Sequence, residues 1–270
     1  MKPYLKRIMS LISLLLVLTS CSAFATQREE LAFPELALAQ ELTETNEFRI
    51  EKIEEIEMIP QPEEPVVISG YGLSYLTIVS EEGTDGSISR QYQVVKGPDD
   101  QIISKLELPD ETQIIEPVAT TYQQGASVQI GATFTPRFTR YGADCAGCTR
   151  LGGGVSASAS GIRVTTTSIL QPDGTWLEGI TYGGRYLFAS NSDLPMCTLI
   201  TIDNHSYSGM GVNPDEPIYG IIGDRGVGAN HLDFFVGSEK TLNKVSPTSN
   251  STPTVTITGF GEWTGRGCNF

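Results

Sequence analysis

The chain has 270 residues, of which 39% are hydrophobic and 8% aromatic, so it can bury at least one core and form one or two domains. Its formal net charge is −14 and its pI is near 4.5. No basic stripe interrupts this acidic composition, which argues against binding DNA or RNA through their phosphates.

Residues 1–25 have the pattern of an export signal. Lys2, Lys6 and Arg7 precede the apolar run LISLLLVLTS, which is too short for a bilayer because a spanning helix needs roughly 20 apolar residues. The mature protein is therefore expected outside the cytoplasm.

Two processing sites for this signal remain open. The stretch LTSC ends at Cys21 and resembles a bacterial lipobox, which predicts lipidation of Cys21 and a membrane anchor. The stretch AFA, residues 23–25, fits an ordinary signal peptidase and predicts secretion to the cell wall.

Four further cysteines can pair in three ways, and export favours disulfides over free thiols. These disulfide candidates are Cys145, Cys148, Cys197 and Cys268. A zinc site built from Cys145, Cys148, His205 and His231 would be convincing only with a second Cys-x-x-Cys, which is absent. No metal and no other cofactor are predicted, and the oligomeric state is left open.

Residues 26–47 are rich in Glu, with Leu and Ala at loosely helical spacing, and are expected to form a solvated acidic linker. From 48 to 126 the pattern changes to short alternating strands separated by Gly, Pro and Asp. It predicts a small, elongated β module. The expected strands are PVVISG, LSYLTIVS, ISRQYQVV, QIISKLEL and TQIIEPVA.

This module resembles the five-glycine (G-five) domain of bacterial surface proteins. The resemblance is carried by EMIP at 57–60, EGTDG at 82–86, the strand 89–95, the segment 108–117 and a closing Gly125. It implies binding to the cell wall or to amino sugars; a spacer that holds the next domain within the wall is the alternative.

Residues 127–270 are again β-rich, and their strand number and glycine content predict a barrel. The expected strands are SVQIGATFT, IRVTTTSIL, WLEGITY, RYLFAS, TLITID, IYGIIGD, LDFFVG and TVTITGF. Walker loops, G-x-S-x-G elbows and H-E-x-x-H helices are absent from the sequence, so nucleotide-binding, serine hydrolase and metalloprotease functions lack support.

Residues 134–260 resemble the three-aspartate (3D) domain. The resemblance is carried by FTRY at 138–141, CAGC at 145–148, VSASASG at 155–161, FASNSDLPMCTLITI and, most specifically, IYGIIGDRGVGANHLDFFVG. It implies an all-β fold in which a six-stranded double-psi β-barrel, related to membrane-bound lytic transglycosylase A, follows the smaller module. It also implies cleavage of peptidoglycan glycan strands that leaves 1,6-anhydro ends.

The resemblance assigns Asp233 as the catalytic acid and Asp224 as a second carboxylate beside the groove. Candidate substrate-binding residues are Thr139, Tyr141, Ser190, Arg225, Asn230 and His231. A carboxyl can protonate a glycosidic oxygen only if its pKa is raised. Leu232, Phe234 and Phe235 are expected to raise the pKa of Asp233 by excluding water, and Asp224 by its like charge. A turn role for Asp224 is the structural alternative.

Three departures from the family pattern bear on activity. First, Ser190 aligns with the family's first aspartate, and Asp193 lies three positions further on. Second, Cys197 replaces a glycine of the family, which suggests a disulfide bond to Cys268. Third, the loop between Asp224 and Asp233 is two residues shorter than is usual in the family. The leading prediction is a lytic transglycosylase. The alternatives are a non-catalytic peptidoglycan-binding or structural protein and an expansin-like protein that loosens the wall.

Overall fold

The computed structural model describes residues 48–214 and 216–270. The export signal, Cys21 and the acidic linker lie outside these ranges. The described chain is almost entirely β, which confirms the predicted all-β class; its helices are two 3₁₀ turns, η1 (Pro109–Glu111) and η2 (Glu239–Lys244). In the same ranges, no helix has the length and apolar character required to cross a membrane.

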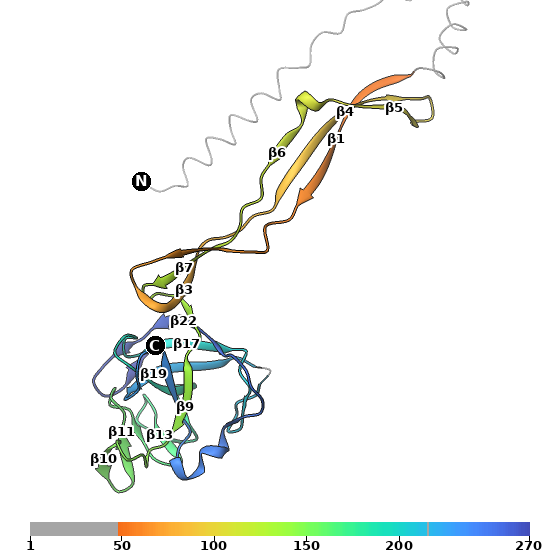
Figure 1. Cartoon of the computed structure of the whole chain (residues 1–270). Helices are drawn as coiled ribbons and strands as arrows, with labels where there is room; N and C mark the ends of the chain where they lie inside the picture. Colours follow the sequence, from red (N-terminus) through yellow and green to blue (C-terminus); the bar gives the residue numbers. More distant parts are fainter. Residues whose placement is uncertain (1–47, 215) are drawn as a thin grey trace, which may run out of the picture. The chain divides into compact units, whose positions relative to one another are not determined.

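The chain divides into two units. Of the described residues, the first contains 48–54 and 91–110. Its sheet has the order β1-β4-β5 (Figure 1) and is formed by β5 (Ile102–Glu107) and by parts of β1 (Arg49–Ile59) and β4 (Gly86–Lys96). Residues 55–59 of β1 and 86–90 of β4 belong to the second unit. The division into a 48–126 module and a 127–270 domain stays a prediction.

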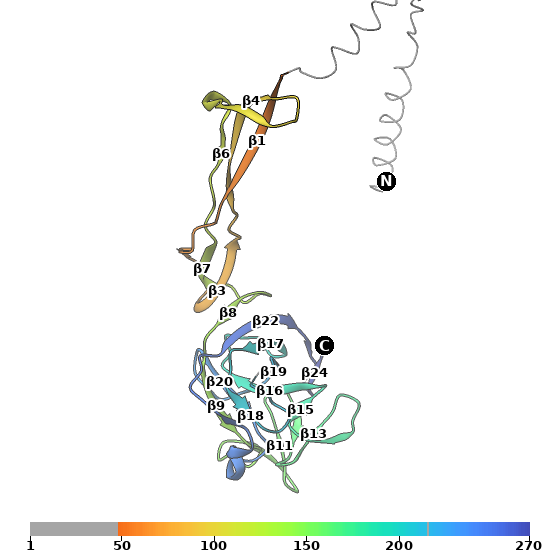
Figure 2. The same cartoon turned by 90° about the vertical axis from the view of Figure 1, so that its right-hand side faces the viewer.

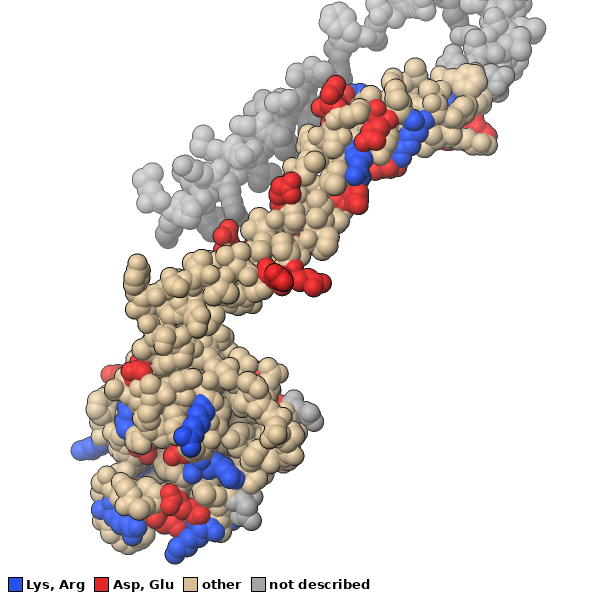
Figure 3. All heavy atoms as spheres, viewed as in Figure 1, with Lys and Arg blue, Asp and Glu red and all other residues tan. Residues whose placement is uncertain are grey.

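The first unit has little apolar core. Val94 is fully buried, whereas all six residues of β5 are exposed. Ion pairs join Lys96 to Glu51, with 2.6 Å between Nζ and Oε2, and Arg49 to Asp100. Figure 3 shows Lys, Arg, Asp and Glu close together on these strands, as such pairs require.

The second unit contains 55–90, 111–214 and 216–270 of the described residues. Its first strands are β2 (Val66–Ser69), β3 (Leu73–Glu81), β6 (Gln113–Ile115) and β7 (Thr121–Ala126). β7 pairs in parallel with β2 and antiparallel with β3, and β6 pairs antiparallel with β4.

Two glycines permit the close approach of these strands. A Cβ at Gly72 would lie 2.1 Å from the carbonyl oxygen of Ala126, and one at Gly86 would lie 2.3 Å from that of Ile115. No side chain fits at such distances, so the backbone contact requires glycine at both positions.

Most of the second unit is built on one sheet path, β8-β22-β17-β19-β16-β20-β9. Its strands are β8 (Thr133–Phe134), β9 (Arg137–Tyr141), β16 (Arg185–Ser190), β17 (Thr198–Asp203), β19 (Ile218–Arg225), β20 (His231–Phe235) and β22 (Thr254–Phe260). The pairs β16–β19 and β9–β20 are parallel, and the others are antiparallel.

The two ends of this path belong to one stretch of chain. β8 and β9 are separated only by Thr135 and Pro136, and Pro136 has no N–H for a ladder. The stretch 133–141 therefore pairs with β22 at its start and with β20 at its end, and the strands lie around a common interior (Figure 2). The double-psi connection stays a prediction.

The interior contains an aromatic cluster. Phe188 of β16 stacks on Phe234 of β20 with 4.6 Å between ring centroids, and Phe138 of β9 meets Phe188 edge-on at 6.3 Å. Phe188 and Phe234 are fully buried and are direct register partners. This pair fixes which face of β16 and β20 points inward.

The remaining strands are short. A five-stranded sheet comprises β10 (Thr149–Gly152), β11 (Val155–Ala157), β12 (Arg163–Val164), β13 (Ser168–Leu170) and β14 (Trp176–Glu178). β15 (Thr181–Tyr182) pairs with β16. Two ribbons are formed by β18 (Tyr207–Ser208) with β21 (Ser246–Pro247) and by β23 (Glu262–Trp263) with β24 (Cys268–Asn269).

Predicted strands agree best where they are buried. The segments 185–190, 198–203 and 254–260 match β16, β17 and β22 in full. The predicted strand 127–135 is wrong over most of its length, because only Thr133–Phe134 pairs. The predicted strands 162–170 and 176–182 each divide into two short strands at a turn.

The four candidate cysteines form two disulfides, Cys145–Cys148 and Cys197–Cys268. The suggested bond between Cys197 and Cys268 is thus confirmed. Both are fully buried, and the backbone of Cys197 has a left-handed φ of 68°. Two disulfides indicate a protein that folds outside the cytoplasm.

The two disulfides should differ in their effect on stability. Cys197–Cys268 closes a loop over a sequence separation of 71, against 3 for Cys145–Cys148. Replacing both cysteines of the long loop by Ala should lower the free energy of unfolding by about 4 kcal/mol, and the short-loop pair by about 2 kcal/mol, because a longer loop restricts the unfolded chain more. Urea unfolding of both double variants measures the difference. Equal losses would contradict the ranking.

Candidate functional site

One pocket of about 450 Å³ contains both predicted carboxylates. This volume lies in the range of small-molecule sites, about 300 to 1,000 Å³. The pocket is lined by Tyr141, Cys145, Ala146, Gly147, Cys148, Thr149, Ala157, Ala159, Ala189, Asp224, Arg225, Gly226, Asp233 and Glu239. β9, β16, β19 and β20 supply its floor residues, and the Cys145–Cys148 turn supplies one wall.

Asp233 lies at the middle of β20, between two neighbouring strands. Its register partners are Thr139 on β9 and Ala189 on β16. The Thr139 hydroxyl donates a 2.6 Å hydrogen bond to Oδ1 of Asp233. The pKa of the Asp233 carboxyl is raised above its ordinary value, mainly by burial. The hydrogen bond from Thr139 and the charge of His231 lower this pKa, whereas the charge of Asp224 adds to the rise.

The expected source of this burial needs correction. Side chains alternate along a strand, so Leu232 and Phe234 point into the core, away from Asp233. Phe235 is on the same face as Asp233, and its ring meets that of Tyr141 at 5.4 Å. Water is excluded from Asp233 by the adjoining strands, not by its immediate chain neighbours.

His231 and Thr139 form a hydrogen-bonded chain with Asp233. His231 is two residues before Asp233 on the same face of β20, and its Nε2 lies 2.8 Å from Oγ1 of Thr139. A hydroxyl has one proton to donate. Because Thr139 donates it to Asp233, His231 must donate from Nε2 to Thr139.

Asp224 is held by three donors at the end of β19. The Tyr141 hydroxyl donates to Oδ2 at 3.0 Å, and the backbone N–H groups of Ala159 and Arg225 donate to Oδ1 at 2.8 Å each. Burial raises the pKa of Asp224, although these donors and the Arg225 charge oppose the rise. The pKa of the Tyr141 hydroxyl is also raised, mainly because the side chain is buried and, second, because of the negative charge of Asp224 beside it.

The other predicted binding residues are placed less directly. Arg225 lines the pocket, and its Nη2 donates to the carbonyl of Leu194 at 2.8 Å. Ser190 is 2% exposed, is the register partner of Arg225 and does not line the pocket. Asn230 has a φ of 50° and donates from Nδ2 to the carbonyl of Thr135, so it shapes the turn into β20.

Sequence reasoning missed part of the lining. It treated Cys145 and Cys148 only as disulfide candidates and did not consider Glu239. Asp144 connects these elements, because its carboxylate accepts from the Ser238 hydroxyl at 2.8 Å and from the Glu239 N–H at 2.7 Å. The available signal was position: the CAGC turn follows the pocket residue Tyr141 by only four residues.

The four residues considered as zinc ligands from the sequence have other partners in the structure. Cys145 and Cys148 are joined in a disulfide. His205 is buried, with Nε2 2.8 Å from the carbonyl of Glu216, and His231 bonds to Thr139.

Comparisons with known proteins do not establish a family. No protein-family model matches the chain, and no curated protein matches it. The solved structures that are similar to part of it include two G5 domains. One is the G5 domain of an IgA1 protease, 12% identical with a TM-score of 0.25, over 30% of this chain and 93% of its own.

The other is HP0197-G5, 19% identical with a TM-score of 0.21, over 29% of this chain and 99% of its own. TM-scores this low do not establish a shared fold. Neither is described as a 3D domain, and the resemblance to that domain and the relation to membrane-bound lytic transglycosylase A stay predictions.

The raised pKa values predict how stability depends on pH. Above the ordinary value of 3.8, folded Asp233 retains a proton that the unfolded chain has released, so the free energy of unfolding falls as pH rises through the folded pKa. Asp233→Asn cannot ionise and should show a smaller fall from pH 4 upward in urea unfolding at several pH values. Parallel curves for the variant and the wild type would contradict the raised pKa.

Asp173→Asn is the matched control for this measurement. Asp173 is exposed and is not a pocket residue, and hydrogen bonds from Thr175 lower its pKa. Its contribution to stability is lost as pH falls, so its replacement should leave the decline above pH 4 unchanged.

Proposed function

We propose that this chain is an exported cell-wall protein, anchored by lipid at Cys21 or secreted, whose domain 127–270 cleaves peptidoglycan glycan strands as a lytic transglycosylase. One observation carries the proposal: Asp233, a carboxyl with a raised pKa, shares an open pocket with a second such carboxyl, Asp224. That pairing suits general acid catalysis at a glycosidic bond.

In the first step Asp233 acts as the acid. Its Oδ1 accepts from Thr139, which leaves Oδ2 to carry the proton towards the glycosidic oxygen. As the proton is transferred, the bond between C1 and that oxygen breaks, the leaving sugar departs with a hydroxyl, and positive charge develops at C1 and the ring oxygen.

In the second step the Asp233 carboxylate acts as the base. It takes the proton of the same sugar's 6-hydroxyl while that oxygen bonds to C1, which closes a 1,6-anhydro ring and restores the acid. No water is consumed, so one carboxyl serves both steps, and no second catalytic carboxyl is needed at a hydrolase spacing.

Asp224 supplies charge rather than a proton in this scheme. Its three donors hold both oxygens, so the carboxylate keeps a fixed position beside the pocket. A fixed negative charge stabilises the cationic transition state and favours the protonated form of Asp233 beforehand.

The first test is product release from purified cell walls. Asp233→Asn should reduce the release of anhydro-ended fragments by a factor on the order of 10² to 10⁴, because it removes the general acid. Asp224→Asn should reduce it less, and Asp173→Asn should leave it unchanged. Wild-type rates in Asp233→Asn would disprove the assignment.

Thr139 and His231 act as positioning residues for the acid. Thr139→Val removes the hydroxyl that joins them to Asp233 and should lower kcat roughly tenfold, the value of one hydrogen bond of about 1.5 kcal/mol to a charged group. It should also move the alkaline limb of the pH–rate profile to higher pH, because the acid must be protonated and the lost bond lowers the pKa of Asp233. Thr139→Ser should restore both; an unrescued loss would indicate a packing role.

A second candidate function is glycan binding without cleavage. Ser190, where the 3D resemblance expects the first aspartate, is buried outside the pocket. Asp193 cannot replace it, because its Oδ2 accepts from the Tyr75 hydroxyl at 3.2 Å and it does not line the pocket. Retention on insoluble peptidoglycan with no soluble product over long incubation would favour this function.

For residues 48–126 we propose a wall-facing module that binds amino sugars or spaces the catalytic domain. The proposal rests on the G-five resemblance. The sparse core of the first unit suits an extended sheet held by strand pairing and ion pairs.

A further inference from the structure

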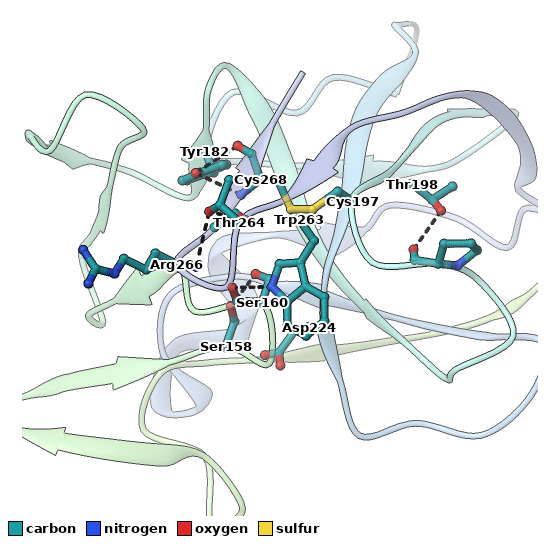
Figure 4. Close-up of a disulfide and its surroundings, with 12 residues drawn as sticks. Ser158, Ser160, Tyr182, Cys197, Thr198, Asp224, Trp263, Thr264, Arg266 and Cys268 are labelled. Atoms are coloured by element: carbon teal, nitrogen blue, oxygen red, sulfur yellow. Dashed lines mark hydrogen bonds between the residues drawn. A yellow bond between two sulfur atoms is a disulfide. The ribbon is translucent and has the colours of Figure 1, made fainter.

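Trp263 lies exposed beside the carboxylate pocket, outside its lining. The side chain is on β23, its residue is 55% exposed, and it is not part of the hydrophobic core. Its indole Nε1 donates a 2.9 Å hydrogen bond to the carbonyl of Ser160 (Figure 4). The indole N–H is thus already hydrogen-bonded within the protein, so a ligand can contact only the apolar face of the ring.

The hairpin that carries Trp263 is held in place. Trp263 is the register partner of Cys268, which is disulfide-bonded to Cys197. The Tyr182 hydroxyl donates to the Cys268 carbonyl at 3.1 Å and accepts from its N–H at 3.2 Å. Thr264 closes the turn through its N–H, 3.0 Å from the carbonyl of Gly267. An exposed ring is therefore presented in one orientation, which lowers the entropy lost on binding.

One short loop connects this ring to the acid site. Ala157 and Ala159 line the pocket, and the Ala159 N–H holds Oδ1 of Asp224. In the next residue, Ser160 donates its N–H to the Gly223 carbonyl at 3.1 Å and accepts the Trp263 indole. Figure 4 shows the Trp263 indole next to Ser160, to which its hydrogen bond is drawn, with Asp224 in the same region of the view. The loop 157–160 thus lines the pocket through its alanines and holds Trp263 through the carbonyl of Ser160.

We propose that Trp263 is a stacking platform for a sugar ring of a glycan strand, next to the ring processed at Asp233. A pyranose with equatorial hydroxyls presents an apolar C–H face, and the negative π-face of an indole is complementary to it. A polymer that fills the pocket continues past it, so a fixed aromatic face at the rim would bind the next sugar. This inference rests on the proposed function, because it requires a glycan in the pocket.

The test uses the two tryptophans of the chain against each other. Trp176, on β14, is 46% exposed and does not line the pocket, so it is the matched control. In the non-cleaving Asp233→Asn protein, Trp263→Ala should weaken binding of tetrasaccharide glycan fragments roughly tenfold, as expected for one aromatic contact. Trp263→Ala should change the affinity for a disaccharide little. Trp176→Ala should change neither the tetrasaccharide affinity nor the disaccharide affinity.

A second measurement does not depend on the folding of the Ala variant. With Trp176→Phe, Trp263 is the one remaining indole, and its fluorescence should shift when the tetrasaccharide is added. Unchanged affinity in Trp263→Ala, or an unchanged Trp263 emission in a protein that binds the tetrasaccharide, would overturn the platform.

The two proposals fail in different ways. If the tetrasaccharide binds and perturbs Trp263 but wild-type protein releases no anhydro product, the platform stands and the enzyme proposal fails. If product is released while Trp263 is unaffected, only the platform fails. If no glycan binds at all, both are wrong.

Discussion

The stack of Phe188 on Phe234 is the constraint on which the site depends. These rings are fully buried register partners on β16 and β20, and they fix the inward face of both strands. Because strand side chains alternate, the next register pair, Ala189 and Asp233, must face the opposite way, into the pocket. A slip of one residue would bury Asp233 in the core and expose Phe234. Hydrophobic packing thus decides where the acid lies.

Parallel pairing then gives Asp233 its hydrogen-bond partner. β9 places Thr139 directly opposite the acid, and the hydroxyl both orients the carboxyl and connects it to His231. On the other side, Asp224 is the next-to-last residue of β19, and Tyr141 and two backbone N–H groups donate hydrogen bonds to its carboxylate. Partial burial of two carboxylates disfavours their charged forms, so these residues lower stability at neutral pH. A cost of this kind is typical of a functional site.

Both disulfides belong to segments that border this site. Cys145–Cys148 forms part of the pocket wall, and Cys197–Cys268 fixes the ribbon that carries Trp263. An oxidising compartment makes such bonds available. A β domain with short irregular strands gains stability from them, because a cross-link restricts loops that the core does not hold.

The sequence by itself determined the β class and the full extent of buried strands such as 185–190, 198–203 and 254–260, because burial on a sheet face leaves a strong local pattern. Asp224 and Asp233 came from the resemblance to the 3D domain, and their catalytic role stays a prediction. It overextended 127–135 and merged 162–170, where exposed turns carry little pattern. Only the tertiary structure decided that Thr139 and His231 bond in series to Asp233, that Asp193 faces Tyr75, and that the CAGC turn and Glu239 line the pocket. These outcomes depend on strand register and on contacts between residues far apart in the chain, which no local pattern encodes.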